Sequence, residues 1–390
     1  EDIGNVVATL RGELITQGEQ VPKFEKKISE IFGKKFGLFV NSGSSANLLA
    51  LSSLELDRGS EVITPCLTFS TTMSPILQLG LVPSLVDVNV KTLNIKVEDI
   101  ENCINKNTKA IFVPNLIGNV PDWDEISKIA KKHKLHVIED SADTIGYDFR
   151  GGNTGLLSDL STTSFYGSHI ITCAGIGGMV CTNDADLYEK MKIVRGWGRS
   201  SELFSPDASL SIEDNLKDRF DIEINGISYD KKFIFEREGY NFFAPEVCAG
   251  FGLAQLKRFD EFFSKRVANF NYLKSKISKN LDDHIISPEE TNGVKTNWLA
   301  YPIILKEGEK NLRTQLQIFL ERKNIQTRTI FSGNITRQPI MKNKIFKTNN
   351  YEFENSDYIM KNGMLIGCHP KLEKSDLDYI CKSLSDFFNV

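Results

Sequence analysis

Short apolar segments alternate with helical segments between residues 36 and 182, and this rhythm restricts the possible folds more than any other feature of the chain. Short apolar runs bounded by turn residues indicate strands, and segments with apolar residues along one side indicate helices. The alternation predicts an α/β fold in which helices cover both faces of a mostly parallel central sheet. The expected strands are 36–40, 61–64, 82–88, 109–114, 135–140, 161–165 and 178–182, and the expected helices are 46–54, 71–78 and 123–133.

The segments outside this region predict two domains. Residues 1–35 have largely helical spacing, and a long helical pattern runs from 244 to 273. The stretch 199–236 is polar and predicts a long excursion rather than a core element. Residues 280–390 mix expected strands with expected helices and indicate a smaller α+β unit. The predicted domains are 1–260, which binds the ligand and carries the excursion, and 261–390, which is the small C-terminal domain.

Charge and composition exclude several classes of protein. A formal net charge of −4 gives no basic field for nucleic acid. No apolar run approaches the roughly 20 residues that span a bilayer, and the amino-terminal residues lack the basic and apolar regions of a signal peptide. The 7 cysteines are scattered without a CxxC pair, which is typical of the reducing cytoplasm and disfavours a disulfide framework or a metal site. We expect a cytoplasmic protein.

A small-residue stretch, Asn41-Ser-Gly-Ser-Ser-Ala-Asn47, lies between an expected strand and an expected helix. Backbone N–H groups at such a helix start can bind an anion, because small side chains permit close approach. Taken alone, however, the stretch is more simply explained as a plain turn with a serine as the helix cap. The glycines of 175–178 precede a strand rather than a helix, so they do not form a dinucleotide-binding motif.

Two further strand ends carry candidate ligand-binding side chains. Asp140 and Asp143 follow a buried strand, and ligands gather at the carboxyl ends of strands in open α/β sheets. A carboxylate there can pair with a protonated ring nitrogen, although Asp140 could instead cap the next helix. Phe69 also follows a strand and is positioned to stack on a planar ring, although an isolated phenylalanine is usually a core residue.

His169 is the most informative single residue. It follows Ser164-Phe-Tyr and precedes a glycine-rich return, a context with little regular structure for a purely structural histidine to stabilise. An imidazole with a pKa near its ordinary value of about 6.5 can both take and give a proton at neutral pH. No lysine occurs between Lys134 and Lys190.

Taken in order, these segments resemble the sugar aminotransferase family of fold-type-I pyridoxal-phosphate enzymes. The resemblance covers nearly the whole chain and rests on the set of motifs rather than on any one of them. Enzymes of this type usually place a lysine where this chain has His169, bonded to the cofactor as a Schiff base. The histidine variant resembles the branch of nucleotide-diphospho-4-keto-6-deoxysugar 3-dehydratases. The matching segments are 41–47, 139–143, 164–166 and 239–241.

The resemblance implies a role for each matching position. His169 would be the catalytic acid and base, and Phe69 would stack on the pyridine ring. Asp140 would pair with the pyridine nitrogen, with Asp143 beside it. Asn241 would reach the cofactor phosphate from a neighbouring subunit, because sites in this family form across a homodimer interface. The residues that would hold the phosphate within the subunit are Gly43, Ser44, Ser45 and Ser164.

Three departures from the family pattern leave the identity of the sugar open. The family's Gly-Tyr-Asn-x-Arg becomes Gly239-Tyr-Asn-Phe-Phe243, which loses a cation. The segment after His169 and the excursion 199–236 are both longer than in the dehydratase branch. A related dehydratase subgroup binds a [2Fe–2S] cluster through cysteines in the region that corresponds to 182–247, where this chain has none, so we expect no cluster.

The resemblance implies an enzyme that uses pyridoxamine 5'-phosphate, or pyridoxal 5'-phosphate, to remove the C3 hydroxyl of a nucleotide-linked 4-keto-6-deoxyhexose. The product would be a dideoxysugar for surface polysaccharide, and glutamate is the expected amino donor. An ordinary sugar aminotransferase is disfavoured, because its lysine is absent. A non-catalytic sensor or scaffold, and an engineered replacement of lysine by His169, remain open alternatives.

Overall fold

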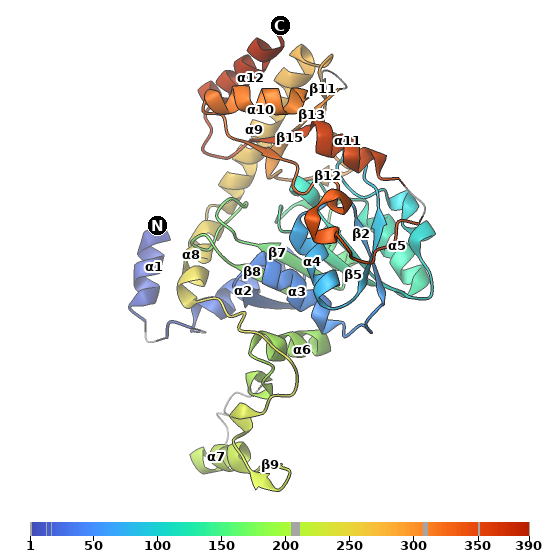
Figure 1. Cartoon of the computed structure of the whole chain (residues 1–390). Coiled ribbons are helices and arrows are strands. Elements are labelled where there is room, and N and C mark those ends of the chain that lie inside the picture. Colours follow the sequence, from blue (N-terminus) through green and yellow to red (C-terminus); the bar gives the residue numbers. More distant parts are fainter. Residues whose placement is uncertain are drawn as a thin grey trace.

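The computed structural model describes residues 2–12, 14–16, 18–203, 211–306, 311–349 and 352–389. Within these residues, a sheet of seven strands forms the centre of the larger part of the molecule, in the order β1-β8-β7-β5-β4-β2-β3 (Figure 1). All seven sequence-predicted strands lie within two residues of the observed bounds. The strands are β1 (Phe36–Val40), β2 (Glu61–Pro65), β3 (Val82–Val86), β4 (Thr108–Pro114), β5 (His136–Asp140), β7 (Leu160–Ser164) and β8 (Gly178–Thr182).

The directions of the strands confirm the predicted, mostly parallel sheet. The β2 strand pairs in parallel with β3 and β4, and β5 pairs in parallel with β4 and β7. Parallel neighbours need crossover connections, and helices or longer segments provide them here. The exception is β8, which is antiparallel to both β7 and β1, because the loop 165–177 reverses the chain without a crossover.

Helices cover both faces of the sheet because neighbouring strand residues point to opposite sides. In β1, Leu38 and Val40 pack in the apolar cluster under α3, α4 and α6, whereas Phe39 packs in the cluster under α2 and α8. The α5 helix covers the second face beside β5. The bounds are α2 (Gln20–Ile31), α3 (Gly43–Ser53), α4 (Ser70–Gln78), α5 (Trp123–His133), α6 (Ala185–Arg195) and α8 (Glu246–Leu256).

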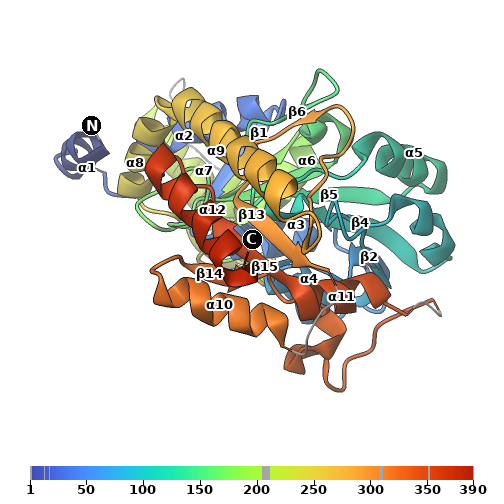
Figure 2. The same cartoon turned by 90° about the horizontal axis from the view of Figure 1, so that it is seen from above.

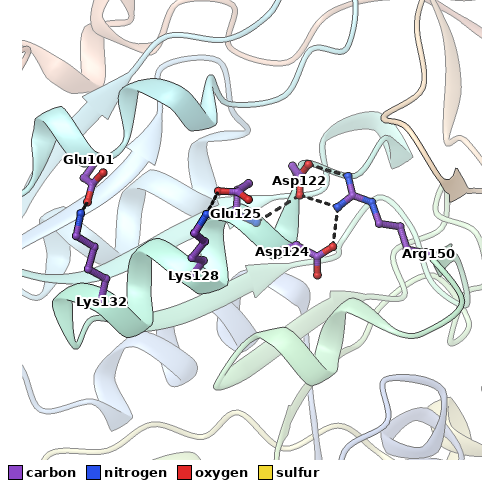
Figure 3. A network of polar contacts seen from close by, with 7 residues as sticks. All are labelled: Glu101, Asp122, Asp124, Glu125, Lys128, Lys132 and Arg150. Carbon is purple, nitrogen blue, oxygen red and sulfur yellow. Dashed lines mark hydrogen bonds and ion pairs between the residues drawn. The ribbon is translucent and has the colours of Figure 1, made fainter.

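The α5 helix shows why the sequence folds locally as predicted. Its N-cap Asp122 accepts from the backbone N–H of Glu125, and its buried face carries Trp123, Ile126 and Ala130. Its exposed face carries ion pairs (Figure 3). They are Lys128 with Glu125, Lys132 with Glu101, and Arg150 with Asp122 and Asp124. Exposed pairs of this kind contribute at most about 1 kcal/mol each, so the buried face stabilises the helix.

The C-terminal part forms a second layer of strands and helices. Four antiparallel strands pair in the order β11-β13-β15-β14, and α9, α10 and α12 pack against them (Figure 2). The stacked rings of Phe270 and Trp298, 4.5 Å apart, lie in the core of this part. The predicted domain boundary at 260/261 falls inside α9 and stays a prediction. The bounds are α9 (Phe259–Asn280), β11 (Ile285–Ile286), β13 (Ala300–Leu305), α10 (Leu312–Arg322), β14 (Thr327–Thr329), α11 (Glu354–Asn362), β15 (Gly363–Gly367) and α12 (Lys374–Phe388).

The single long helical pattern predicted from 244 to 273 is wrong: the structure divides it into α8 and α9 at Lys257 and Arg258. The break changes the direction of the chain, so that α8 packs against α2 and α1 (Asp2–Leu10), whereas α9 packs against β13 and α12. Arg258 at the break binds the carboxylate of Asp2, with nitrogen–oxygen distances of 2.6 and 2.8 Å. The apolar spacing in the sequence continues across the break, so it gives no sign of this change of direction.

The described residues 211–236 of the excursion project from the body beside α6 (Figure 1). None of the described residues from 211 to 236 is buried, which confirms that this part is not a core element. It contains a helix that the sequence analysis did not assign, α7 (Ile212–Phe220), capped by Ser211, and a short hairpin of β9 (Glu223–Ile224) and β10 (Ile227–Ser228). Residues 204–210 lie outside the described residues. No helix in the described ranges has the length and apolar character needed to cross a bilayer.

Candidate active site

A cavity of about 330 Å³ lies at the carboxyl ends of β4, β5 and β7, beside the amino terminus of α3. This is the position at which ligands bind in open α/β sheets. The C-terminal part closes the cavity from the other side through Leu299, Arg328 and Phe331. The remaining lining residues are Ser42, Gly43, Ser44, Asn47, Phe69, Thr71, Thr72, Pro114, Leu116, Asp140, Ala142, Asp143, Ser164, Tyr166, Ser168, His169, Ile176 and Gly177.

The first turn of α3 forms one end of the cavity. Ser42 is the N-cap, and its hydroxyl accepts from the backbone N–H of Ser45 at 3.1 Å. A Cβ atom on Gly43 would lie only 2.5 Å from the Cβ of Ser164, so only glycine permits this approach of the two segments. The backbone N–H groups of Gly43 and Ser44 and the hydroxyl of Ser164 therefore share a small space at a helix start, which is an arrangement that suits a phosphate.

Asp140 lies at the end of β5 and is held by three donors. Asn47 Nδ2 and Thr72 Oγ1 both donate to Oδ2 at 2.8 Å, and the backbone N–H of Ala142 donates to Oδ1 at 3.1 Å. Burial raises the pKa of Asp140, and these hydrogen bonds lower it. The carboxyl is thus fixed in direction and poised to bind a cationic partner in the cavity.

The orientation of the Asn47 amide follows from its partners. Thr162 Oγ1 donates to Asn47 Oδ1 at 2.6 Å, and Asn47 Nδ2 donates to the carbonyl oxygen of Thr71 at 3.2 Å as well as to Asp140. Both Nδ2 hydrogens are therefore used, and the amide has one satisfactory orientation. A chain of hydrogen bonds thereby runs from Thr162 on β7, through Asn47 on α3, to Asp140 on β5.

Asp143 is a second buried carboxyl in the same cavity. The backbone N–H of Ile117 donates to its Oδ2 at 2.8 Å. Burial raises the pKa of Asp143 to about 7, and the nearby charge of Asp140 acts in the same direction. Near neutral pH, this carboxyl therefore exists in both protonation states and can donate or accept a hydrogen bond.

His169 is held in the loop 165–177 between β7 and β8. The loop is anchored by buried Ile170, Ile171 and Cys173, and the backbone N–H of His169 donates to the carbonyl oxygen of Tyr166 at 3.0 Å. The ring nitrogen Nδ1 lies 3.2 Å from the carbonyl oxygen of Ser164. Because a carbonyl only accepts, Nδ1 carries the hydrogen, and Nε2 keeps its lone pair.

The protonation behaviour expected for His169 from the sequence, a pKa near 6.5, is wrong for this structure. Burial lowers the pKa to about 4, the bond to Ser164 raises it, and the positive charges of Arg266 and Arg328 lower it further. The imidazole is therefore neutral at neutral pH, with Nε2 ready to accept a proton.

The cavity brings together most of the residues predicted from the sequence, but not all of them. Ser45 does not line it, because its hydroxyl and N–H bond to Ser42. Asn241 does not line the cavity of its own chain, and its carbonyl oxygen accepts from Asn41 Nδ2 at 3.5 Å. Its predicted contact with a neighbouring subunit stays a prediction. The predicted residues that do line the cavity are Gly43, Ser44, Phe69, Asp140, Asp143, Ser164 and His169.

Sequence reasoning missed several lining residues. Asn47 ends the stretch 41–47 and Thr72 lies in the expected helix 71–78, but the sequence analysis gave neither a role. The available signal was a polar residue on a helix that begins at the end of a strand. Arg328 and Phe331 come from the C-terminal part, and no local pattern marks them. The ring of Phe331 meets that of Phe69 edge-to-face, with centroids 5.7 Å apart, so these two rings face each other at the mouth of the cavity.

The described residues of the cavity lining include no lysine. No group of three or more histidine, cysteine, aspartate or glutamate side chains in the described ranges is placed to hold a metal ion. The cavity thus offers a helix-start anion site, two buried carboxyls and one neutral imidazole.

Comparisons with known proteins agree with this geometry. The profile of the DegT/DnrJ/EryC1/StrS aminotransferase family matches residues 1–385. The lipopolysaccharide biosynthesis protein RfbH of Salmonella typhimurium is 36% identical over 99% of this chain and 88% of its own. GDP-4-keto-6-deoxy-D-mannose 3-dehydratase of Escherichia coli O55:H7 is 30% identical over 96% of this chain and 94% of its own. GDP-perosamine synthase of Caulobacter vibrioides is 32% identical over 80% of this chain and 76% of its own.

Solved structures of GDP-4-keto-6-deoxymannose 3-dehydratase share the fold. One, which contains GDP-perosamine, superposes with a TM-score of 0.87 and 28% identity over 98% of this chain and 97% of that chain. Another, of the E. coli enzyme, contains hydrated pyridoxal phosphate and has the same TM-score and identity, over 98% and 96% of the two chains. The predicted fold-type-I architecture and the resemblance to the sugar aminotransferases are confirmed.

Proposed function

The chain belongs to the DegT/DnrJ/EryC1/StrS aminotransferase family, and on this premise we propose that it is a pyridoxamine-phosphate-dependent dehydratase. It would remove the C3 hydroxyl of a nucleotide-diphosphate-linked 4-keto-6-deoxyhexose and yield a 4-keto-3,6-dideoxysugar for surface polysaccharide. The observation that carries the proposal is the cavity itself, which is lined by a neutral histidine and, in its described residues, by no lysine.

The residues of the cavity fit pyridoxal or pyridoxamine phosphate. Because Gly43 lets the start of α3 approach Ser164 closely, the N–H groups of the first turn and the Ser164 hydroxyl lie together at the cavity, which suits a phosphate group. Asp140 is a buried carboxyl whose raised pKa a cationic pyridine nitrogen would lower again. Phe69 is 51% exposed at the cavity mouth, where its ring is available to a flat ligand.

When bound, the cofactor supplies an amine for the C4 ketone of the sugar and a ring that withdraws electrons. His169 would accept at Nε2 the proton that the bound cofactor gives up. The same imidazole would return this proton to the departing C3 hydroxyl, which would leave as water. Because Ser164 holds Nδ1–H, the ring keeps one tautomer and one orientation through both transfers.

The two carboxyls have separate tasks in this scheme. Asp140, oriented by Asn47 and Thr72, would keep the pyridine nitrogen protonated and so strengthen the electron withdrawal. Asp143 lies beside it with a pKa of about 7, so its carboxyl could donate a hydrogen bond to the ring substituents or accept one from them. His169 alone then moves the proton that decides the reaction.

The main alternative is a nucleotide-sugar aminotransferase. It is favoured by the perosamine synthase among the relatives and by the description of the family. It is disfavoured by the lining of the cavity, because amino transfer in this family uses a lysine that the described lining does not provide. A sensor or scaffold is disfavoured by the retention of an oriented Asp140 and a neutral His169 in one cavity.

The partners follow from the same proposal. Glutamate is the proposed amino donor that regenerates the amine form of the cofactor. The proposed assembly is a cytoplasmic homodimer, in which Asn241 of one subunit contacts the cofactor phosphate of the other. In its own chain, Asn241 lies on the surface beside Gly196, which leaves its side chain available for such a contact.

Product analysis tests the proposed reaction. The purified protein, loaded with pyridoxamine phosphate and supplied with glutamate, is incubated with a panel of nucleotide-linked 4-keto-6-deoxyhexoses. Mass spectrometry and NMR of the sugar products are expected to show loss of the C3 oxygen without gain of nitrogen for at least one sugar. A 4-amino sugar would identify an aminotransferase, and no turnover of any panel member would favour the sensor or scaffold.

A further inference from the structure

The side chain of Arg266, on α9, is a buried cation. Only 1% of the residue is exposed, and no ion pair within the described residues neutralises its guanidinium group. Its Nη1 instead donates to the carbonyl oxygens of Leu299 at 2.9 Å and of Trp298 at 3.4 Å. A buried charge without an opposite charge is costly unless hydrogen bonds replace those that it made to water. The guanidinium is therefore committed to the backbone of residues 298–299.

The peptide group between Trp298 and Leu299 connects this cation to the proposed cofactor cavity. Its oxygen accepts from Arg266, and its nitrogen, that of Leu299, donates to the carbonyl oxygen of Ile117 at 2.8 Å. Hydrogen bonds in series of this kind polarise one another. The backbone N–H of Ile117 in turn donates to Asp143 Oδ2 at 2.8 Å. A line of contacts thus runs from Arg266 to a buried carboxyl in the cavity.

The backbone along this line has little freedom to move. Ile117 has a φ of 58°, in the left-handed region that a β-branched residue seldom adopts. A Cβ atom on Gly118 would lie only 2.8 Å from the Cα of Trp298, so glycine permits the close approach of the two segments. On the other side, Asn297 Nδ2 donates to the carbonyl oxygen of Ile145 at 3.0 Å. Strained and closely fitted backbone of this kind is concentrated at functional sites.

The charge of Arg266 also acts on His169. Burial is the largest cause of the low pKa of this imidazole, and the positive charge of Arg266 lowers the pKa further. The other titratable or charged side chains that line the same cavity are Asp140, Asp143, Tyr166 and Arg328. Arg266 itself is not among the described residues of the lining, so it acts on the cavity from the surrounding protein.

We propose that Arg266 is a positioning residue for the active site. It holds the peptide of residues 298–299 against Ile117, and thereby fixes the N–H group that orients Asp143. It also adds a permanent positive charge to the surroundings of His169. The value of these two effects for catalysis rests on the proposed function, whereas the contacts and the charge of Arg266 do not depend on which reaction the protein performs.

Histidine NMR of the cofactor-free protein tests the effect of the charge. The chain has 5 histidines, so their labelled imidazole signals can be followed over pH, and His169→Asn identifies the signal of His169. Arg266→Met removes the charge and is expected to raise the pKa of His169, whereas Arg266→Lys keeps the charge and is expected to leave it nearly unchanged. Arg266→Gln, which is neutral and keeps an N–H donor, replaces Arg266→Met if that variant does not fold. Lys265→Met, which removes a lysine whose partner is the exposed Glu373, is the matched control and is expected to behave as the wild type does.

Amide hydrogen exchange tests the effect on the backbone. In Arg266→Met, we expect the N–H groups of Ile117 and Leu299 to exchange about 10-fold or more faster than in the wild type, because a hydrogen bond to a charged group is lost from this segment. The control is the N–H of Cys66, which donates to the carbonyl oxygen of Val86 at 2.8 Å elsewhere in the sheet. Its exchange is expected to change by a smaller factor, so that a general loss of stability is distinguished from a local one.

The outcomes separate this proposal from the dehydratase proposal. An unchanged pKa of His169 in the neutral Arg266 variant, or equal acceleration of all three amides, would show that Arg266 only stabilises the fold and would overturn the proposal. If a panel sugar is accepted, Arg266→Met is expected to lower kcat with little change in KM, and a wild-type kcat would also overturn it. Both expected results in a protein that dehydrates no panel sugar would support the positioning role while contradicting the proposed reaction.

Discussion

Replacement of Asn47 by leucine would break the hydrogen-bonded chain that orients Asp140. Leucine has a similar volume and no polar atoms, so the change removes hydrogen bonds with little loss of packing. Asp140 Oδ2 would keep only the bond from Thr72, and the Thr71 carbonyl would lose its donor. The Thr162 hydroxyl would be left with the carbonyl oxygen of Glu139 at 3.4 Å.

The magnitude follows from the three bonds that are lost. A hydrogen bond to a charged group contributes about 1.5–3 kcal/mol, and each neutral bond contributes about 0.5–1.5 kcal/mol. We therefore expect the free energy of unfolding to fall by about 2.5–6 kcal/mol in Asn47→Leu. The bond from Asn47 also lowers the pKa of Asp140, so its loss raises that pKa further. A smaller fraction of Asp140 is then ionised, and the pH below which the cofactor is lost moves upward.

Urea denaturation of the cofactor-free protein and cofactor titrations at several pH values measure these two effects. A double-mutant cycle with Thr162→Val measures the energy of the hydrogen bond between Thr162 and Asn47. In the double variant both partners of this bond are replaced, so neither is left as an unpaired polar group. We expect the double variant to cost at least about 1 kcal/mol less than the sum of the single variants. Ser53→Ala, a buried serine on the same helix with only a local bond to Ala50, is the control. Additive costs, with an unchanged pH dependence of cofactor binding, would refute the reasoning.

Three further predictions concern the cofactor, metal and pH. Borohydride treatment of the cofactor-loaded protein is expected to leave no cofactor attached to the chain, because the described cavity lining contains no lysine; a peptide carrying reduced cofactor on lysine, found by mass spectrometry, would contradict this. Anaerobically purified protein is expected to lack stoichiometric iron, because no cysteine occurs from 182 to 247, and dependence of turnover on an added reductase would count against it. His169 has a pKa of about 4 in the folded protein and of about 6.5 in the unfolded chain. As the pH falls from about 6.5 to about 4, the unfolded state therefore takes up the proton first. The cofactor-free wild type is expected to lose stability relative to His169→Asn over this range. Asp143 has the opposite sign, with a folded pKa of about 7 against about 4 unfolded, so the wild type loses stability relative to Asp143→Asn as the pH rises from about 4 to about 7. Denaturation midpoints at pH 4.5 and 7.5 measure both differences, and equal differences at the two pH values would show that these groups are not buried as described.

The sheet could be predicted because its strands are apolar nearly throughout and are separated by helices with clear periodicity. The residues at the ends of those strands, Asp140 and Ser164 among them, could be predicted for the same reason, since the carboxyl ends of parallel strands meet at one edge. Gly43 belonged to a recognisable stretch beside the first strand. These predictions succeed because short segments of the sequence determine the local structure on which they depend.

Other features depend on segments that are distant in sequence. Arg328 and Phe331 reach the cavity only because the C-terminal part packs over the sheet, and nothing in their neighbours indicates it. The low pKa of His169 results from burial and from the charges of Arg266 and Arg328. These residues are far from His169 in the sequence, so the residues around His169 do not predict the shift. The break between α8 and α9 likewise results from what each helix packs against.

The central claim is that His169 moves the proton that makes the reaction a dehydration. Its most direct test is single-turnover consumption of an accepted 4-keto sugar by His169→Asn, loaded with pyridoxamine phosphate and shown by circular dichroism and cofactor titration to be folded and occupied. General acid and base groups contribute about 10²–10⁴-fold, roughly 3–5 kcal/mol of barrier, so the account predicts a loss of at least about 100-fold with cofactor affinity retained. Dehydration by this variant at the wild-type rate would contradict the account.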